Sequence, residues 1–154
     1  FDYLRLKFPI MGALELQASI ARFARGLSTL LSSGVPILEA LSISERLAGN
    51  AVVEEVLERA REAVRNGQSL GQQIESAHLF PVFMTQLIST GEESGKLSSF
   101  LELIANFYEE RIDTFLNRLA TVLEPILLIV LGSVIGVIVA AMLLPLTELS
   151  TSIH

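Results

Sequence analysis

The chain has 154 residues, of which eleven are Lys or Arg, seventeen are Asp or Glu and none is Cys. The lack of cysteine excludes disulfide frameworks, thiol nucleophiles and thiolate metal sites. The charges are interspersed and sum to −6, so the sequence has neither the basic footprint typical of nucleic-acid binding nor a polybasic lipid patch. We therefore expect no nucleic-acid partner, and the length suits one modest domain with one membrane segment.

The first half of the chain has the pattern of a helical protein. Apolar residues recur at steps of three and four, and no segment keeps the period-two alternation of a strand. In the first helix they form one stripe, namely Leu16, Ile20, Phe23, Leu27, Leu30 and Leu31. A first helix is expected over residues 14–33 with its end at Gly34, and Pro36 opens a second helix that ends near Gly49. Asn50 is the predicted N-cap of a third helix, which runs to Asn66.

The later helices are marked by caps and glycines. Ser69 with Gln72 predicts a capping box for a short fourth helix. Pro81 starts a fifth helix, which the segment 91–95 should break, and from residue 98 the helical pattern continues without a visible stop to residue 144. We therefore predict an all-α, antiparallel helical bundle of about six helices whose last long helix continues into a C-terminal transmembrane helix.

The run from Pro125 to Thr147 carries no formal charge and is dense in Ile, Leu and Val. Its 23 positions would form a helix of about 34 Å, enough to cross a hydrocarbon core of roughly 30 Å. A buried core helix is the alternative, but a domain this small has little interior to hide one. We expect a membrane helix, with a kink at Pro125 near the membrane surface.

The basic residues near this run predict its orientation. Arg111 and Arg118 precede it, whereas no Lys or Arg follows it, so the positive-inside rule places the preceding domain in the cytoplasm. The predicted organisation is a juxtamembrane segment over residues 1–14, a cytoplasmic six-helix-type domain over 15–124, a transmembrane helix over 125–147 and a short periplasmic tail over 148–154.

The segment Gly91–Leu97 superficially resembles a phosphate-binding loop. It has three residues between its glycines instead of four, and Leu rather than Ser or Thr follows the Lys, so we predict an interhelical turn with Gly91 or Gly95 at positive φ. Glu92 and Glu93 are candidates for a polar contact with a partner, and Glu92 is expected to contribute little to stability. Two adjacent acids do not supply a coordination shell, so no metal site is predicted.

Small residues mark one face of the membrane run. Gly132 and Gly136 form a small-x-x-x-small pair that Ala140 extends, which would allow close packing of another helix, although glycines also occur in membrane helices without such a role. Elsewhere, His78 and His154 lie far apart, and no spacing of Ser, His and acids typical of catalysis is found. We predict neither a catalytic site nor a cofactor.

Several short motifs also occur in a characteristic order. They are Phe8–Gly12, Ala21–Arg25, Leu30–Leu41, Gly67–Leu70, Phe80–Pro81, Gly91–Leu97, Glu124–Pro125 and Leu144–Pro145. Their order and spacing resemble the F protein of type II secretion systems, which is also the inner-membrane platform protein of type IV pili. The resemblance covers nearly the whole chain.

This resemblance implies the second of two six-helix cytoplasmic domains and the last of three membrane helices, so the first copy and two membrane helices are expected to be missing. It implies a non-enzymatic platform in the bacterial inner membrane that couples a cytoplasmic assembly ATPase to pilins or pseudopilins. Membrane lipid, other inner-membrane assembly proteins and further copies of the chain are the other implied partners. The alternatives are a tail-anchored helical adaptor or signalling protein, and a membrane-tethered enzyme, which would need a catalytic constellation.

Overall fold

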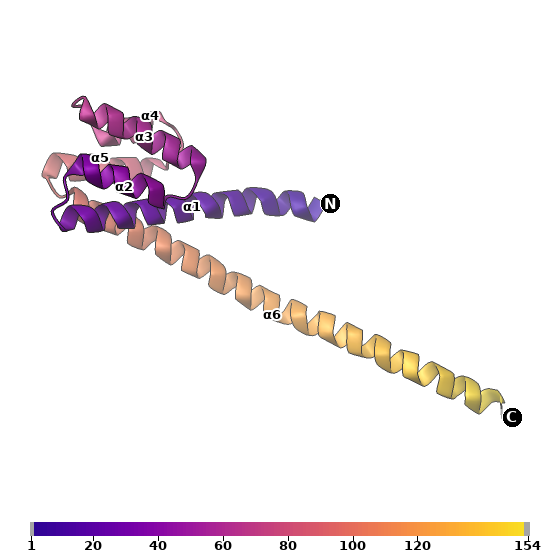
Figure 1. Cartoon of the computed structure of the whole chain (residues 1–154). Helices are drawn as coiled ribbons and strands as arrows, with labels where there is room; N and C mark the ends of the chain where they lie inside the picture. Colours follow the sequence, from indigo (N-terminus) through magenta and orange to yellow (C-terminus); the bar gives the residue numbers. More distant parts are fainter. Residues whose placement is uncertain (1, 153–154) are drawn as a thin grey trace. The chain divides into compact units, whose positions relative to one another are not determined.

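The computed structural model describes the backbone of residues 2–152 and the side chains of residues 12–146. Within this range it contains six α-helices and no strand (Figure 1). The helices are α1 (Asp2–Ser32), α2 (Ile37–Leu47), α3 (Ala51–Arg65), α4 (Leu70–Ser76), α5 (Val82–Ser94) and α6 (Leu97–Ser152). The chain divides into a first compact unit that ends at Ile112 and a second that begins at Asp113. We call the first unit the helical domain and the part of α6 in the second unit the α6 extension.

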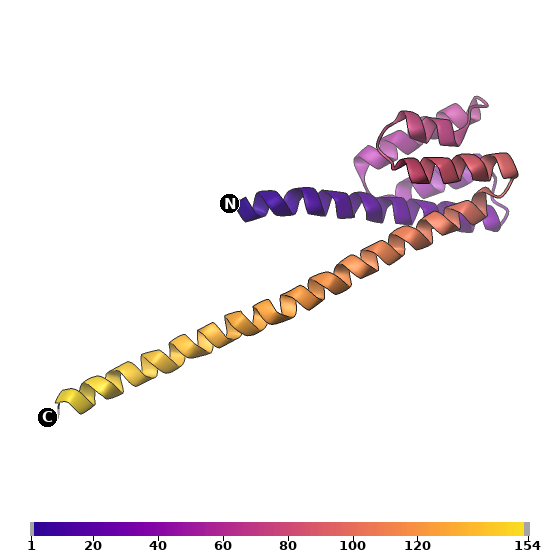
Figure 2. The same ribbon diagram turned by 180° about the vertical axis from the view of Figure 1, so that it is seen from behind.

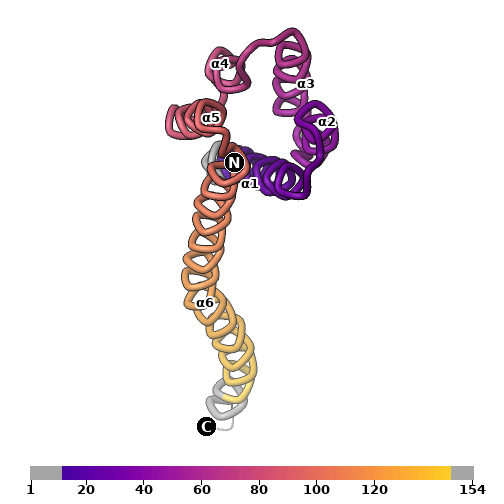
Figure 3. The backbone as a smooth tube through the Cα atoms, turned by 90° about the vertical axis from the view of Figure 1, so that its left-hand side faces the viewer, coloured from indigo at the N-terminus to yellow at the C-terminus, as the bar shows by residue number. Residues whose placement is uncertain are grey.

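The helical domain is a bundle in which short loops join helices that are neighbours in sequence. Each of α1 to α4 packs on the helix that follows it, and the five helices α1 to α5 surround a common centre (Figure 3). The view from behind shows the tight turn between α5 and the first turns of α6 (Figure 2). The predicted all-α bundle is confirmed.

Helix ends in the domain follow the predicted caps. Gly34 has φ of 90°, and the amides of Gly34 and Val35 donate to the carbonyls of Leu31 and Leu30 at 3.1 and 3.0 Å, the pair of bonds that closes a helix behind a glycine. The Asn50 side chain accepts from the next amides of α3. Both predicted boundaries are confirmed.

The first helix is longer than the sequence pattern predicts. α1 begins at Asp2 instead of near residue 14 and passes through Pro9. A proline inside a helix removes one backbone hydrogen bond, but residues 2–13 include Leu, Arg, Lys, Met and Ala, which are strong helix formers. The predicted start was wrong, because the proline removes one backbone hydrogen bond without ending the helix.

The last helix also extends further than expected. α6 reaches Ser152, beyond the predicted end at Leu144, and it contains both Pro125 and Pro145. Leu and Glu after the second proline favour the helix, so one lost bond does not end it. Residues 153–154, at the end of the predicted periplasmic tail, lie outside the described range.

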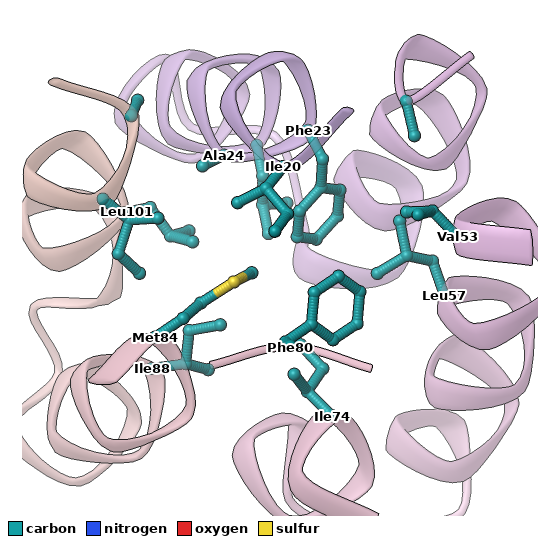
Figure 4. Close-up of a cluster of buried hydrophobic side chains, with 14 of the residues drawn as sticks. Ile20, Phe23, Ala24, Val53, Leu57, Ile74, Phe80, Met84, Ile88 and Leu101 are labelled. Atoms are coloured by element: carbon teal, nitrogen blue, oxygen red, sulfur yellow. The ribbon is translucent and has the colours of Figure 1, made fainter. Parts of the chain in front are cut away.

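The core of the domain draws on all six helices, and Figure 4 shows part of it. In α1 the predicted stripe is correct, because Ile20, Phe23 and Leu27 are at most 1% exposed. The other large side chains that are less than 2% exposed are Leu41, Val53, Leu57, Leu70, Ile74, Met84, Ile88, Leu101 and Ile104. Burial of a side chain of this size stabilises the fold by about 1.5–3 kcal/mol, so these residues are the main source of the domain's stability.

Polar contacts hold the first turns of α6 against α1. The hydroxyl of Ser28 donates to the Ser98 carbonyl at 2.8 Å, and the Ser98 hydroxyl donates to the Ser28 carbonyl at 3.1 Å. Further along, the Arg25 guanidinium donates two hydrogen bonds to Glu109, at 3.0 and 2.9 Å, and one to Asn106. We call the Arg25–Glu109 pair the α1–α6 clasp.

Candidate docking turn and membrane segment

The turn after α5 contains one glycine at positive φ. Gly95 has φ of 72°, and the amide of Lys96 donates to the Gly91 carbonyl at 3.0 Å. Gly91 itself is buried inside α5, where a Cβ would lie 2.9 Å from the Cα of Leu97. The prediction of positive φ is therefore confirmed at Gly95, whereas the expectation that the whole segment 91–95 breaks the helix was wrong. Gly91 is needed for a close approach of backbones rather than for a turn.

The carboxylate of Glu92 caps the N-terminus of α4. Its carboxylate accepts hydrogen bonds from the Ser69 hydroxyl at 3.0 Å and from the amides of Leu70 and Gly71 at 2.9 and 2.6 Å. The Ser69 hydroxyl in turn accepts from the amide of Gln72 at 3.4 Å. These contacts satisfy amides that have no partner within α4, and a negative charge is favoured at this end of a helix.

This arrangement changes the account of Glu92. The expectation that it contributes little to stability does not fit these contacts, because removing the carboxylate would leave two part-buried amides without an acceptor. The predicted N-cap at Ser69 is confirmed. A partner contact for Glu92 stays a prediction, and much of its hydrogen-bonding capacity is used within the domain.

Glu93 lies in a different environment. It is exposed and lines a shallow hollow of about 300 Å³ between α4 and α5, together with Glu75, Thr85 and Thr90. Glu75 and Glu93 form no ion pair within the described part of the chain. Two unpaired carboxylates beside hydroxyl groups suit contact with a basic side chain, so of the two predicted acids Glu93 is better placed to meet a partner.

A second hollow of about 330 Å³ opens between α1, the loop before α5 and α6, with Leu16, Phe80, Tyr108 and Arg111 in its lining. Burial raises the pKa of the Tyr108 phenol, and the nearby Arg111 charge acts in the opposite direction. The Arg111 guanidinium carbon lies 5.7 Å from the centre of the Phe107 ring, within the range of a cation–π contact. Arg111, one of the two arginines used to predict the membrane orientation, therefore also packs on an aromatic ring of the domain.

The domain contains a further ion pair between α2 and α3. Arg61 donates to Glu45 at 2.7 Å, and the two side chains are only 18% and 13% exposed. The second carboxylate oxygen of Glu45 and Nε of Arg61 have no hydrogen-bond partner. Burial raises the pKa of the Glu45 carboxyl, while Arg61 opposes that shift. This pair is a structural contact at a helix interface rather than a site open to a ligand.

The described side chains offer no coordination set for a metal ion, since no three His, Asp or Glu residues among them gather in one place. His78 is exposed at the end of α4, with φ of 52°. The arrangement of polar groups in this part of the chain is that of helix caps and ion pairs.

The α6 extension carries the predicted membrane segment. The helix from Leu97 to Leu146 is long and apolar enough to cross a membrane, and its most apolar part has a mean hydropathy of 3.0 with none of it buried. A methyl group added at Gly132 or Gly136 would meet no atom within 4 Å, so the predicted packing face with Ala140 is open in this structure. A kink at Pro125 stays a prediction, and the helix is assigned as continuous through that residue.

Two arginines of the motif Ala21–Arg25 have roles that sequence analysis did not assign. Arg25 forms the α1–α6 clasp, and Arg22 donates to the carbonyls of Leu47 and Ala48 at 3.1 and 2.7 Å, at the end of α2. The sequence contained one indication of these roles. Arg22 and Arg25 are three residues apart in α1 and lie beside its buried positions, so both cations lie at the edge of the apolar stripe.

Comparison with known proteins gives a family for this arrangement. A sequence model of the family described as "Type II secretion system (T2SS), protein F" matches residues 23–145. The chain is 40% identical over 149 residues to the type IV pilus assembly protein PilC of Thermus thermophilus, which covers 96% of this chain and 37% of the relative. It is 35% identical over 154 residues to PilC of Myxococcus xanthus, covering 100% of this chain and 37% of the relative.

A relative named for secretion is similar to a comparable degree. The type II secretion system protein F of Pseudomonas aeruginosa is 36% identical over 145 residues, covering 94% of this chain and 36% of that protein. The chain thus spans a little over one third of the length of these curated relatives. The family match begins within α1 and ends at Pro145, so it takes in the helical domain from Phe23 onward and the apolar part of α6. The chain belongs to the family of type II secretion system protein F.

Proposed function

We propose that the chain is a non-enzymatic platform component of a type II secretion or type IV pilus machine in the bacterial inner membrane. The observation that carries this proposal is that the family match spans the helical domain and the uncharged segment of α6 together. The names of its relatives include both pilus assembly and secretion, which supports a function that the two machines share.

In this proposal the segment 125–147 crosses the membrane. The helical domain lies in the cytoplasm, because Arg111 and Arg118 precede the segment and no Lys or Arg follows it. The residues after 147 then lie in the periplasm, and membrane lipid is the solvent of the uncharged segment. The side chains from 126 to 146 that the structure describes are exposed, as expected of a helix surrounded by lipid or by other membrane helices.

The proposed role is to couple a cytoplasmic assembly ATPase to pilins or pseudopilins that leave the membrane. The first turns of α6 pack in the domain core, where Leu101 and Ile104 are buried, and the α1–α6 clasp joins the helix to α1 further along. A displacement of the domain by the ATPase would therefore act directly on α6. The exposed Glu93, beside Glu75 in the hollow between α4 and α5, is the proposed contact for a basic partner surface, and Glu92 is the weaker candidate.

Within the membrane, the proposed partners are further copies of the chain and other inner-membrane assembly proteins. Gly132, Gly136 and Ala140 would allow the backbone of a neighbouring helix to approach closely. A bend at Pro125 would set the direction in which α6 enters the bilayer, because the proline leaves one carbonyl of the preceding turn without its helical donor.

Single cysteines test the orientation, since the chain has none of its own. The exposed Glu58 on α3 is a suitable position in the helical domain, because it caps no helix and lies outside the core. In intact spheroplasts, a membrane-impermeant maleimide should label Ser152→Cys but not Glu58→Cys, and permeabilised cells should show both. Labelling of Glu58→Cys alone in intact spheroplasts would reverse the proposed topology.

Cells that lack the gene test the function. We expect loss of surface pili or of a secreted substrate, and recovery when the complete protein is supplied. The hexameric assembly ATPase should co-purify with the wild-type protein from detergent-solubilised membranes, and less of it should co-purify with a Glu93→Lys variant of unchanged thermal stability. Normal pili and secretion in the deleted cells would instead favour a tail-anchored adaptor of another pathway.

A further inference from the structure

The hollow between α1, the loop before α5 and α6 combines apolar walls with a few polar groups, and we call it the Tyr108 hollow. All the residues that line it belong to the helical domain. Its volume of about 330 Å³ lies at the lower end of the range of small-molecule sites, which are mostly apolar with a few placed polar groups. Its apolar walls come from α1 and the loop and include Leu16, Ile20, Leu79, Phe80 and Pro81.

Tyr108 is the buried polar group of this hollow. The residue is only 2% exposed, yet its hydroxyl forms no hydrogen bond within the part of the chain that the structure describes, whereas a buried tyrosine hydroxyl usually has a partner. Among the described side chains, the polar atoms that are enclosed and lack a partner belong to Ser19, Glu45 and Arg61. The Tyr108 hydroxyl therefore retains access to solvent, and the hollow is the opening that Tyr108 lines.

This hydroxyl is a hydrogen-bond donor at neutral pH. Burial raises the pKa of the phenol above its ordinary value of 10, so the group keeps its proton. A ligand that enters the hollow with an acceptor atom would therefore satisfy a donor that the fold leaves unpaired.

Arg111 supplies a second donor at the same end of the hollow. It follows Tyr108 by three residues on α6, which places the two side chains on one face of the helix. Its guanidinium carbon lies 5.7 Å from the centre of the Phe107 ring, and it forms no ion pair within the described residues. A guanidinium presents a planar pair of donors that matches a carboxylate, and its single charge balances one negative charge.

We propose that the Tyr108 hollow binds a small amphiphilic carboxylate, whose anion accepts hydrogen bonds from Arg111 and Tyr108 and whose apolar chain packs on the walls. A neutral apolar ligand would leave both donors unpaired, and a doubly charged phosphate would exceed the one cation present. At roughly 30 Å³ for each water-sized group, the volume holds about eleven non-hydrogen atoms. This size corresponds to a medium-chain fatty acid.

Titration with octanoate tests the site on the full chain in deuterated detergent micelles, followed by amide chemical shifts of the ¹⁵N-labelled protein. We expect saturable shifts at Leu16 and Tyr108 and none at Glu58 of α3, which lies outside the hollow. Octanol, which has the apolar chain without the charge, and acetate, which has the charge without the chain, should each bind several-fold more weakly. Equal binding of octanol and octanoate would overturn the carboxylate as the preferred group.

Two variants test the donors, with a matched control on the same helix. Arg111→Gln and Tyr108→Phe should each weaken octanoate binding several-fold and leave octanol binding unchanged, because both keep the apolar walls. Arg118→Gln, at the next arginine of α6 and outside the hollow, should bind octanoate as the wild type does. Uptake of octanoate by micelles is the same for all variants. Octanoate binding that is equal in the wild type, Arg111→Gln and Tyr108→Phe would overturn the site.

The curated relatives are longer than this chain, so the same titration is repeated with the protein purified from its own cells. Octanoate binding in both preparations is the expected result. Binding to this chain alone would show that another segment of the protein fills the hollow, and would overturn a site for a free ligand. The absence of octanoate binding to this chain would overturn the inference and leave the platform role standing, since pilus and secretion output test that role separately.

Discussion

The helical domain and the α6 extension are both rich in apolar residues but dispose of them differently. In the domain, Phe23, Leu27 and Ile104 have no measurable exposure, whereas no described side chain from Asp113 to Leu146 is buried. The domain buries its apolar side chains against one another within one chain. The extension requires something outside that chain, either lipid or another helix, so the two regions differ in what their stability depends on.

Their polar groups differ in the same way. In the domain, side chains bridge separate helices, as in the pairs Arg25–Glu109 and Arg61–Glu45. In the extension, the hydroxyls of Thr121 and Ser133 donate to carbonyls four residues earlier in α6. Hydrogen bonds within one helix satisfy these hydroxyls without a partner outside it, which is what a helix in lipid requires.

A substitution that creates a cavity in the domain core should give the largest difference in stability between the two regions. Phe23→Ala should lower the free energy of unfolding by about 3–5 kcal/mol, because it removes a fully buried ring and leaves a void. Leu128→Ala, a similar truncation in the extension, should leave that free energy unchanged. Denaturant unfolding of the full chain in detergent, followed by circular dichroism, measures both variants. Equal destabilisation would mean that the two regions unfold as one.

The adjacent acids of α5 give the next effect. Glu92→Ala should cost about 1–3 kcal/mol of unfolding free energy, since two amides of α4 lose their acceptor. Glu93→Ala, one residue further on and exposed, should stay within about 0.5 kcal/mol of the wild type. Identical melting curves for the two variants would show that the carboxylate of Glu92 does not hold α4 in solution.

Local rules predicted much of the domain from sequence. The glycine after α1, Asn50 before α3 and Ser69 before α4 act through bonds to residues within a few positions, and such bonds can be read from a single segment. The stripe Ile20, Phe23 and Leu27 was visible because burial on one face of a helix repeats with the helical period.

The contacts that were missed join residues far apart in sequence. Glu92 meets the start of α4 across 22 positions, and Arg25 meets Glu109 across 84. No local spacing specifies either pair, because the folding of the intervening helices brings them together. The docking role of Glu92 was inferred from its place in a glycine-bounded turn, whereas the structure places it inside α5, and this is why its stabilising role was not anticipated.

The α1–α6 clasp should give a smaller and pH-dependent effect. The Arg25 guanidinium lowers the pKa of the Glu109 carboxyl below its ordinary value of 4.5, so the pair contributes stability above that pH and loses it as the pH falls through the folded-state pKa. Since both side chains are partly exposed, we expect about 0.2–1 kcal/mol at neutral pH.

Glu109→Gln isolates this contribution, with the exposed Glu110→Gln as its control. The difference in unfolding free energy between wild type and Glu109→Gln should be present at pH 7 and shrink below pH 4.5. Glu45, whose pKa burial raises, acts with the opposite sign but cancels in this comparison. A difference that is constant from pH 7 to pH 3 would show that the clasp is not electrostatic.

The smallest expected effect on the helical domain comes from Gly136→Leu. The position is open in the structure, and Leu is at least as favourable in lipid as Gly, so insertion and the unfolding free energy of the domain should not change. Pairing of membrane helices should nevertheless fall, because a Leu side chain keeps the partner backbone away. Oligomer recovery by chemical crosslinking in membranes measures this loss, and Val134→Leu on another face of the helix is the control. Unchanged oligomer recovery and unchanged pilus or secretion output in Gly136→Leu would place this face against lipid, and the extension would then differ from the domain only in its solvent.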